Sequence, residues 1–309
     1  MHIVANPGIL ISTLIDRNGL EPTDYGPVFV KELSMTPYSE EEIARMANRL
    51  RRRTVEMVWR AQAGHPGGSL SAADILATLY FRVLRIDPKR PDWEDRDRFV
   101  LSKGHAAPVY YATLMERGYF SEELLATYDE IGSCLQGHPD VAAPGVDIGS
   151  GSLGQGLSVA VGMALGAKLK GKDLRVYALV GDGETQEGQI WEAAMAASKF
   201  QLDNLCAILD CNRLQLVGFI DQCMPIDPVA AKWQAFNWHV LEIDGHNVGE
   251  IASACEMAKT MKGKPTMIVA HTIKGKGVSF MENSPAWHAR APTDAEKDQA
   301  LAELAAEVE

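Results

Sequence analysis

The chain has 309 residues, of which 46% are hydrophobic and 23% are charged, and its formal net charge is −11. This composition is near the average for globular proteins, and it excludes a disordered tail, a fibrous repeat and a small disulfide-rich protein. The acidic balance argues against a general nucleic-acid binder, because broad contact with phosphates needs a positive field.

The compartment is inferred from the termini and the cysteines. No apolar run reaches the roughly 18 residues needed to cross a bilayer. The apolar stretch at 3–15 is interrupted by polar residues and is not preceded by Lys or Arg, so a signal peptide is not expected. The five cysteines form no C-x-x-C pair, which favours free buried thiols. We therefore expect a cytoplasmic protein without a membrane partner.

The first part of the chain is predicted to be irregular and then helical. Residues 1–38 are rich in proline and are expected to form an extension. A helix is predicted from Ser39, because Ser39 and Glu42 have the spacing of a capping box and apolar residues follow at helical intervals. We expect it to end near Gly64, with a second helix over 71–84.

The remaining chain alternates short apolar runs with helical patterns. Strands are predicted over 98–101, 174–180, 205–209, 239–243 and 266–270, and helices over 159–170, 190–200, 251–261 and 294–308. Buried strands separated by helices imply an α/β fold in which a parallel β-sheet is covered by helices on both faces. The predicted organisation is an extension over 1–38, one domain over 39–292, and a C-terminal helix over 293–309.

Two predicted strands end in oxygen-bearing side chains. Asp182 lies in Gly181-Asp182-Gly183-Glu184 after one strand, and Asn212 follows the next. Both strand ends should meet at one edge of a parallel sheet. Together with the main-chain oxygen of Leu214, they would supply three of the about six oxygens that Mg²⁺ prefers, and a diphosphate and water would supply the others. An ordinary strand-to-helix turn is the alternative, since Asp-Gly is common in turns.

Glycine-rich turns carry three histidines. His65, His105 and His138 each follow a glycine, and His288 lies in a less distinctive segment. Imidazoles can donate, accept and transfer protons near neutral pH. The alternative is that each histidine is a surface or core group. The segment 149–154 formally matches a dinucleotide fingerprint, but no strand precedes it, so a dinucleotide site is disfavoured.

Taken together, these motifs resemble those of the thiamine diphosphate enzymes, and within them the transketolases. The unit from Gly181-Asp182-Gly183 to Asn212 is similar to the diphosphate-binding motif of that family. The resemblance covers about residues 39–292. Further motifs occur in the family's order at 63–68, 102–105, 137–139, 151–157, 191–194, 203–205 and 272–277.

The resemblance implies the N-terminal subunit of a split transketolase. Such an enzyme transfers a two-carbon ketol unit from a ketose (phosphate) donor to an aldose (phosphate) acceptor. The implied cofactors are thiamine diphosphate and Mg²⁺, which Ca²⁺ or Mn²⁺ could replace. The family's pyrimidine-binding domain, which carries the glutamate that activates the cofactor, does not follow here. The implied partner is therefore a separate C-terminal transketolase subunit, in a heterotetramer.

The resemblance also implies a role for each candidate residue. The implied catalytic residues are His65, His105, His138 and His288. His138 would bond the donor's terminal hydroxyl, His65 and His288 the hydroxyl at the bond that breaks, and His105 and His288 would reach the diphosphate end or the reacting centre. Leu216 would lie against the thiazolium, and Glu187 would face the partner's glutamate. The implied metal ligands are Asp182, Asn212 and the Leu214 carbonyl. The implied cofactor contacts are His105, Gly151, Leu153, Gly181, Asp182, Gly183, Glu184, Glu187, Asn212, Leu216 and His288.

Several alternatives stay open from the residues alone. Leu216 could be a core residue, and Glu187 a solvated carboxylate at a helix start. Lys274 and Lys276 fit either a solvated turn or a loop beside the cofactor. The function could also be that of a 2-oxo acid dehydrogenase α subunit or a deoxyxylulose phosphate synthase, which the segment 137–139 disfavours, or that of a non-catalytic interaction subunit.

Overall fold

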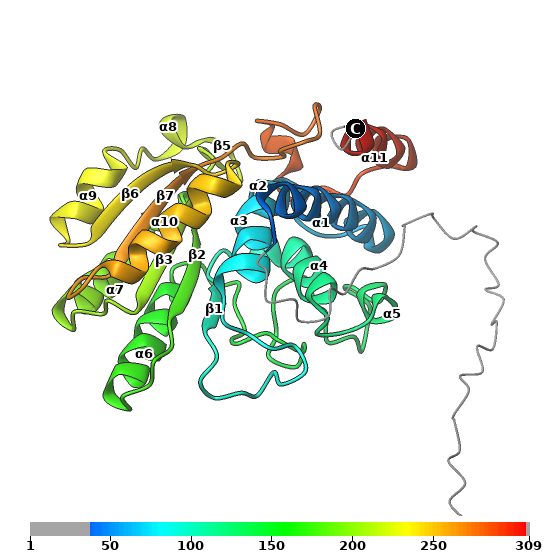
Figure 1. Cartoon of the computed structure of the whole chain (residues 1–309). Coiled ribbons are helices and arrows are strands. Elements are labelled where there is room, and N and C mark those ends of the chain that lie inside the picture. The colour runs from blue at the N-terminus through cyan, green and yellow to red at the C-terminus, as the bar shows by residue number, and fades with distance from the viewer. Residues whose placement is uncertain (1–37, 307–309) are drawn as a thin grey trace, which may run out of the picture. The chain divides into compact units, whose positions relative to one another are not determined.

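A computed structural model describes residues 38–306, so the predicted extension lies outside the described residues except for Tyr38. Within this range one sheet of five strands has only parallel neighbours (Figure 1). Their order is β1-β2-β3-β7-β6, which confirms the predicted parallel α/β sheet. The strands are β1 (Arg98–Leu101), β2 (Val176–Gly181), β3 (Leu205–Cys211), β6 (His239–Asp244) and β7 (Thr266–His271).

Helices cover both faces of the sheet because successive side chains of a strand point to opposite sides. Tyr177 and Leu179 of β2 belong to the buried cluster on one face. Ala178 and Val180 belong to the cluster on the other. The helices of the first cluster are α1 (Glu40–Ala61), α3 (Ala73–Thr78), α4 (Ala107–Arg117) and α10 (Val248–Thr260). Those of the second are α6 (Gln155–Leu169), α7 (Gly188–Lys199) and α9 (Val229–Ala235).

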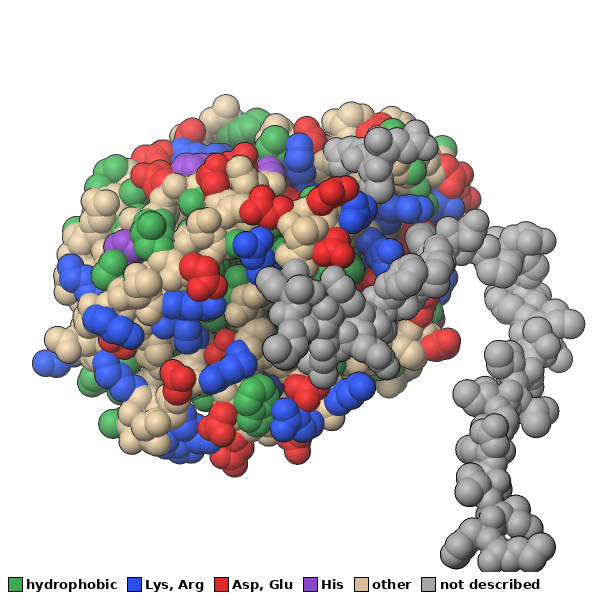
Figure 2. Space-filling view, viewed as in Figure 1, with side chains coloured by type: hydrophobic (Ala, Val, Ile, Leu, Met, Phe, Trp, Pro, Cys, Tyr) green, Lys and Arg blue, Asp and Glu red, His purple; other side chains and the backbone are tan. Residues whose placement is uncertain are grey.

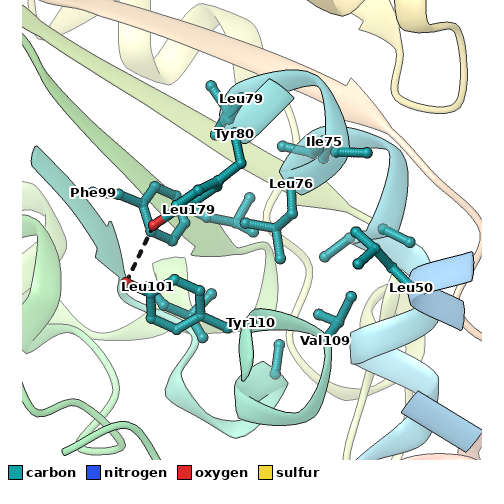
Figure 3. Packing of buried hydrophobic residues seen from close by; sticks show 14 of the residues in the cluster. Leu50, Ile75, Leu76, Leu79, Tyr80, Phe99, Leu101, Val109, Tyr110 and Leu179 are labelled. Atoms are coloured by element: carbon teal, nitrogen blue, oxygen red, sulfur yellow. Dashed lines mark hydrogen bonds between the residues drawn. The ribbon is translucent and has the colours of Figure 1, made fainter. Parts of the chain in front are cut away.

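The first cluster contains a group of packed aromatic rings. Figure 3 shows Tyr80, Phe99 and Tyr110 together, with a hydrogen bond of 3.3 Å between the two tyrosine hydroxyls. Burial raises the pKa of both tyrosines far above the ordinary value, so these hydroxyls remain protonated. The bond gives the buried Tyr80 hydroxyl a partner, and the Tyr110 hydroxyl also donates to Gly145 O at 3.3 Å.

The beginning of α1 confirms the predicted capping box. Ser39 Oγ accepts a hydrogen bond from Glu42 N, and Glu42 Oε2 accepts one from Ser39 N, at 3.1 and 2.8 Å. The helix predicted over 71–84 corresponds to α3 and the π-helical turn that directly follows it (Leu79–Val83), which together span 73–83. A separate short helix, α2 (Pro66–Ser71), precedes it and was not predicted. Pro66 is a favoured first residue of a helix, so α2 begins there.

The C-terminal helix α11 (Asp294–Ala306) packs against the start of the domain. Ala300 and Leu304 lie in a third buried cluster with Val55 of α1 and Trp287. Between residues 38 and 306, no helix has the length and apolarity that a membrane span requires. The remaining short elements are α5 (Glu122–Leu125), β4 (Leu214–Gln215), β5 (Gly218–Phe219), α8 (Ile220–Cys223) and 3₁₀ turns at Gly104–Ala106, Gly183–Gln186 and Pro285–Trp287.

The surface carries charges of both signs. Figure 2 shows basic and acidic side chains interspersed over the viewed face. Many form local ion pairs, as where Lys172 contacts Glu94 and Asp95 at 2.8 and 2.9 Å. All five cysteines are free; Cys223 is exposed and Cys134 half-buried, so the expectation of buried thiols holds for the other three.

Candidate active site

Four neighbouring strands end at one edge of the sheet, and a polar segment follows each. The segment 102–105 follows β1, Asp182 follows β2, Asn212 follows β3, and the segment 272–277 follows β7. Parallel strands bring their carboxyl ends together, which is where ligands bind in α/β sheets. Because Gly181 pairs with Asp210, β2 and β3 end side by side, as the sequence predicts.

Asp182 and the turn after β3 are joined by a direct hydrogen bond. Asp182 Oδ2 accepts from Arg213 N at 2.5 Å, and Oδ1 accepts from Gly183 N at 2.7 Å. Asn212 Oδ1 accepts from Leu214 N at 3.1 Å. Asp182 and Asn212 are only 2% and 6% exposed. The oxygen groups predicted as metal ligands therefore belong to one compact, buried unit.

The electrostatics of this unit favour a bound cation. Burial, and then the nearby Asp210 carboxylate, raise the pKa of Asp182 to about 7. A divalent cation would relieve both effects, because it stabilises the ionised carboxylate. Among the described residues, no three His, Cys, Asp or Glu side chains form a metal-binding group. A cation here would thus depend on one carboxylate, an amide, a carbonyl and ligand oxygens, as Mg²⁺ does.

Two buried lysines lie beside the strand ends, each only 1% exposed. Lys103 Nζ donates to Gly68 O at 2.8 Å and to Asp210. Lys274 Nζ contacts Leu214 O at 3.0 Å and His288 Nδ1 at 2.7 Å. Burial, and then Lys103, lower the pKa of Lys274 to about 8. The ammonium group of Lys274 can offset part of the charge of a diphosphate at this edge, whereas that of Lys103 is paired with Asp210.

For these lysines the structure differs from what the sequence alone predicts. A solvated turn at Lys274 is wrong, because its ammonium is buried. Lys276, two residues later, is partly exposed and lies 3.8 Å from Glu282. Lys103 and Asp210 were not predicted as functional residues. The signal for Lys103 was its place beside Gly104-His105, but the burial that makes its charge important depends on the tertiary structure.

The structure brings all four candidate histidines together. The ring centroid of His65 lies 5.5 Å from that of His105, 5.8 Å from that of His138 and 5.5 Å from that of His288. His105 and His288 are stacked at 5.2 Å. His65 precedes α2, His105 follows β1, and His138 and His288 come from loops. Because Lys274 touches both His288 and Leu214, this cluster adjoins the strand-end unit.

Three of the four imidazoles, those of His65, His105 and His288, are held in their neutral form. Burial, and then the neighbouring His138, lower the pKa of His65 to about 4. Burial, and then Lys274, lower that of His288 to about 3. Burial also lowers the pKa of His105 well below the ordinary value. A neutral imidazole can donate at one nitrogen and accept at the other, so the cluster suits polyhydroxylated ligands.

Buried polar atoms in the cluster also lack protein partners. Within residues 38–306, His65 Nδ1 and Ser150 Oγ are buried without a hydrogen-bond partner. Such atoms are rare in folded proteins and point to a ligand or water. Gly151 lies next to Ser150 with φ +140°, and an added Cβ would lie 2.9 Å from His138 Cδ2. A glycine is therefore required for the loop to approach His138.

The remaining candidate residues divide into internal and exposed groups. Glu184 is 2% exposed and accepts from Ser102 Oγ at 2.5 Å, Gly154 N at 2.9 Å and Gly181 N at 3.0 Å. It therefore joins three segments of the site, and its direct contact with a cofactor stays a prediction. Glu187 is exposed. Leu216, at 61% exposed, is not a core residue.

The comparisons with known proteins agree with this geometry. The family model described as "Transketolase, thiamine diphosphate binding domain" matches residues 43–307. The 6-deoxy-6-sulfo-D-fructose transketolase subunit of Clostridium sp. strain MSTE9 is 48% identical over 269 residues, which cover 86% of this chain and 98% of that subunit. An apulose-4-phosphate transketolase subunit of Phocaeicola vulgatus is 43% identical, with 87% and 96% covered.

A solved structure gives the same result for the fold. The transketolase of Campylobacter jejuni superposes with a TM-score of 0.82 at 36% identity. The match covers 85% of this chain and 42% of that one, so the chain spans less than half of that transketolase. Since the family model and the relatives cover most of the chain, it belongs to the transketolase family and carries that family's thiamine diphosphate-binding domain.

Proposed function

We propose that this chain is the cofactor-binding subunit of a transketolase that acts with a second polypeptide. The observation that carries this proposal is the contact of Lys274 with both His288 and Leu214. It places a histidine cluster suited to sugar hydroxyls next to a strand-end unit suited to a metal and a diphosphate. The alternatives, a 2-oxo acid dehydrogenase or a non-catalytic subunit, are not favoured by the relatives.

The residues of the strand-end unit would hold Mg²⁺ and the diphosphate. Asp182, Asn212 and the Leu214 carbonyl would supply three oxygens, and Lys274 would supply positive charge. Gly181 and Gly183 would contact the diphosphate through their backbone. When bound, thiamine diphosphate supplies the carbon nucleophile that accepts the ketol unit. The chain's own contribution is to bind and orient it.

The histidine cluster would bind the sugar. In this proposal His138, which is exposed, bonds the terminal hydroxyl of the donor. His65 and His288 bond the hydroxyl at the breaking bond and can pass on its proton, because both rings are neutral at pH 7. His105 lies between these groups and the buried Lys103, and would contact the cofactor.

The surface beside the site supports a partner chain. Five apolar side chains are exposed to solvent there, as is typical of an interaction surface. They are Leu153, Leu216, Val217, Phe219 and Met224, and they are here called the apolar rim. A hollow of about 400 Å³ lined by Trp191, Ile226 and Phe236 adjoins the rim at Met224. The two relatives above are subunits by name. We infer that a C-terminal transketolase subunit covers the rim, in a heterotetramer.

The substrate is proposed to be a ketose with an anionic terminal group. The relatives are named for a sulfonated sugar and for a sugar phosphate. We therefore propose a donor that carries a terminal sulfonate or phosphate, with the pentose phosphates among the candidates. A cytoplasmic location, where such sugars are metabolised, remains part of this proposal.

Reconstitution tests the proposal. The chain is mixed with a C-terminal transketolase subunit, thiamine diphosphate, Mg²⁺ and an aldose phosphate as acceptor. Ketol transfer to this acceptor is measured with xylulose 5-phosphate and 6-deoxy-6-sulfo-D-fructose as donors. We expect turnover only when both chains are present. Turnover with pyruvate plus an aldehyde, and none with any ketose, would contradict the proposal.

Two variants separate the roles of the two halves of the site. Asp182→Ala should abolish Mg²⁺-dependent retention of the cofactor, because it removes the charged ligand. His138→Ala should reduce donor turnover and leave cofactor binding nearly unchanged, as measured by calorimetry. Equal losses of turnover and cofactor binding in His138→Ala would argue against a substrate role.

A further inference from the structure

Asp210 is a fully buried carboxylate behind the strand-end unit, with an exposure of 0%. Its Oδ2 accepts hydrogen bonds from Ser71 Oγ at 2.7 Å, from Asn212 Nδ2 at 3.2 Å and from the ammonium group of Lys103. Its Oδ1 accepts from Thr272 Oγ1. The four donors come from α2, the end of β3, the turn after β1 and the loop after β7. Both oxygens are therefore engaged by protein groups, and the side chain is not exposed to a ligand.

Of these four hydrogen bonds, the one from Asn212 Nδ2 to Asp210 bears on the proposed metal site. An asparagine side chain has an acceptor end and a donor end of nearly the same shape, so its hydrogen-bond partners decide which end faces which way. An ionised carboxylate can only accept. Asp210 therefore accommodates the NH₂ end of Asn212 and repels the oxygen end.

The oxygen end is consequently directed to the turn that adjoins Asp182. Asn212 Oδ1 accepts from Leu214 N at 3.1 Å, and within the same turn Arg213 N bonds to Asp182 Oδ2 at 2.5 Å. An amide oxygen has two lone pairs, so one remains for a cation after the bond to Leu214. If the amide were reversed, it would present two N–H groups to that cation.

We propose that Asp210 is a positioning residue for the divalent cation, which it serves by fixing the orientation of the Asn212 amide. This inference rests on the proposed function, in which Asp182 and Asn212 hold Mg²⁺. The competing explanation is a purely structural one, in which Asp210 serves only as the partner of the buried Lys103. The two explanations differ in whether the effect of losing Asp210 on cation affinity depends on the residue at position 212.

A double-mutant cycle separates them. Mn²⁺ is titrated into the assembled two-subunit protein with saturating thiamine diphosphate, and free Mn²⁺ is measured by electron paramagnetic resonance. Asp210→Asn is made in the natural chain and again in an Asn212→Asp background. A carboxylate at position 212 has two equivalent oxygens and no orientation to be fixed, so the positioning role disappears in that background.

We expect Asp210→Asn to weaken Mn²⁺ binding by about 10- to 100-fold in the natural chain, as for other residues that orient metal ligands. In the Asn212→Asp background the same change should not weaken Mn²⁺ binding, because no amide orientation is left to lose and the change also removes the repulsion between two neighbouring carboxylates. Asp147→Asn is the matched control, because Asp147 is also buried and accepts from Arg96 and Phe99 N. It should leave Mn²⁺ affinity within about twofold.

Equal losses in both backgrounds, or no loss in the natural chain, would overturn the inference. If Asp210→Asn alone does not fold, as judged by thermal unfolding without metal, the comparison is between Asn212→Asp and the double variant. Equal or tighter Mn²⁺ binding by the double variant supports the inference, and weaker binding by the double variant overturns it. A natural protein that binds no Mn²⁺ with the cofactor would instead refute the proposed function.

Discussion

At the scale of single residues, the site depends on charges and imidazoles removed from water. His65 is central, because its ring lies within 6 Å of three other imidazole rings. Its pKa falls from 6.5 to about 4. Between these two values the unfolded chain binds a proton at His65 that the folded chain does not. Stability is therefore lost as the pH falls from 6.5 towards 4, and above pH 6.5 His65 contributes no pH dependence.

This linkage predicts a measurable change in His65→Gln. The free energy of unfolding of the natural chain should decrease from pH 6 to pH 5, and the variant should take up about one proton fewer on unfolding. Urea unfolding at several pH values in this range measures the slope. The carboxylates that titrate nearby are the same in both proteins, so they cancel. Identical slopes would contradict a depressed pKa at His65.

Lys274 and Lys276 form a natural pair for a second prediction. Lys274→Met removes a buried ammonium that contacts Leu214 O and His288, whereas Lys276→Met removes a partly exposed one. A hydrogen bond from a charged group contributes about 1.5–3 kcal/mol. We expect thiamine diphosphate affinity, measured by calorimetry with Mg²⁺ and the partner present, to fall at least about tenfold in Lys274→Met. Lys276→Met should bind within about twofold of the natural protein, and similar losses in both would refute the distinction.

At the scale of elements, the site depends on buried hydrogen bonds that hold loops against the ends of strands. Glu184 connects the segment after β1, the loop before α6 and the end of β2 through Ser102, Gly154 and Gly181. Asp210 connects α2, β1, β3 and β7 in the same way. Such polar connections tie together elements that are distant in sequence, because each buried donor must find an acceptor.

The connection through Glu184 predicts a large stability effect. Glu184→Ala leaves three donors without their acceptor, and each buried unsatisfied group costs about 1–3 kcal/mol. The free energy of unfolding should decrease by about 3 kcal/mol or more in chemical denaturation. Glu187→Ala, three residues later and exposed, should change it by less than about 0.5 kcal/mol. A Glu184→Ala chain as stable as the control would show that other groups replace these bonds.

At the scale of the whole molecule, the apolar rim is exposed to solvent, and we propose that a partner chain covers it. Leu216 and Val217 lie at the tip of the β4–β5 hairpin and are 61% and 74% exposed. Gln186 Nε2 donates to Gln215 Oε1 at 2.7 Å and to Met224 O at 2.9 Å, so the hairpin and Met224 flank the turn after Asp182. A partner that covers this rim would also close the site.

A charge on the rim should therefore disrupt assembly. Val217→Asp would place a carboxylate where the proposed interface excludes water, and we expect at least about a tenfold loss of affinity for the C-terminal subunit in analytical ultracentrifugation. Leu169→Asp is the control, because Leu169 is similarly exposed, at 79%, but lies at the end of α6, on the side of the sheet where the strands begin. If both variants assembled like the natural chain, the partner would have to bind elsewhere.

The sequence by itself determined the α/β class, the five strands and the pairing of Asp182 with Asn212 at neighbouring strand ends. Those features follow from local periodicity and from the rule that parallel strands end together. Only the tertiary structure decided the grouping of the four histidines, the burial of Lys103 and Lys274 and the hydrogen bonds of Asp210. Burial and hydrogen-bond partners come from residues far apart in the chain, so no local pattern specifies them.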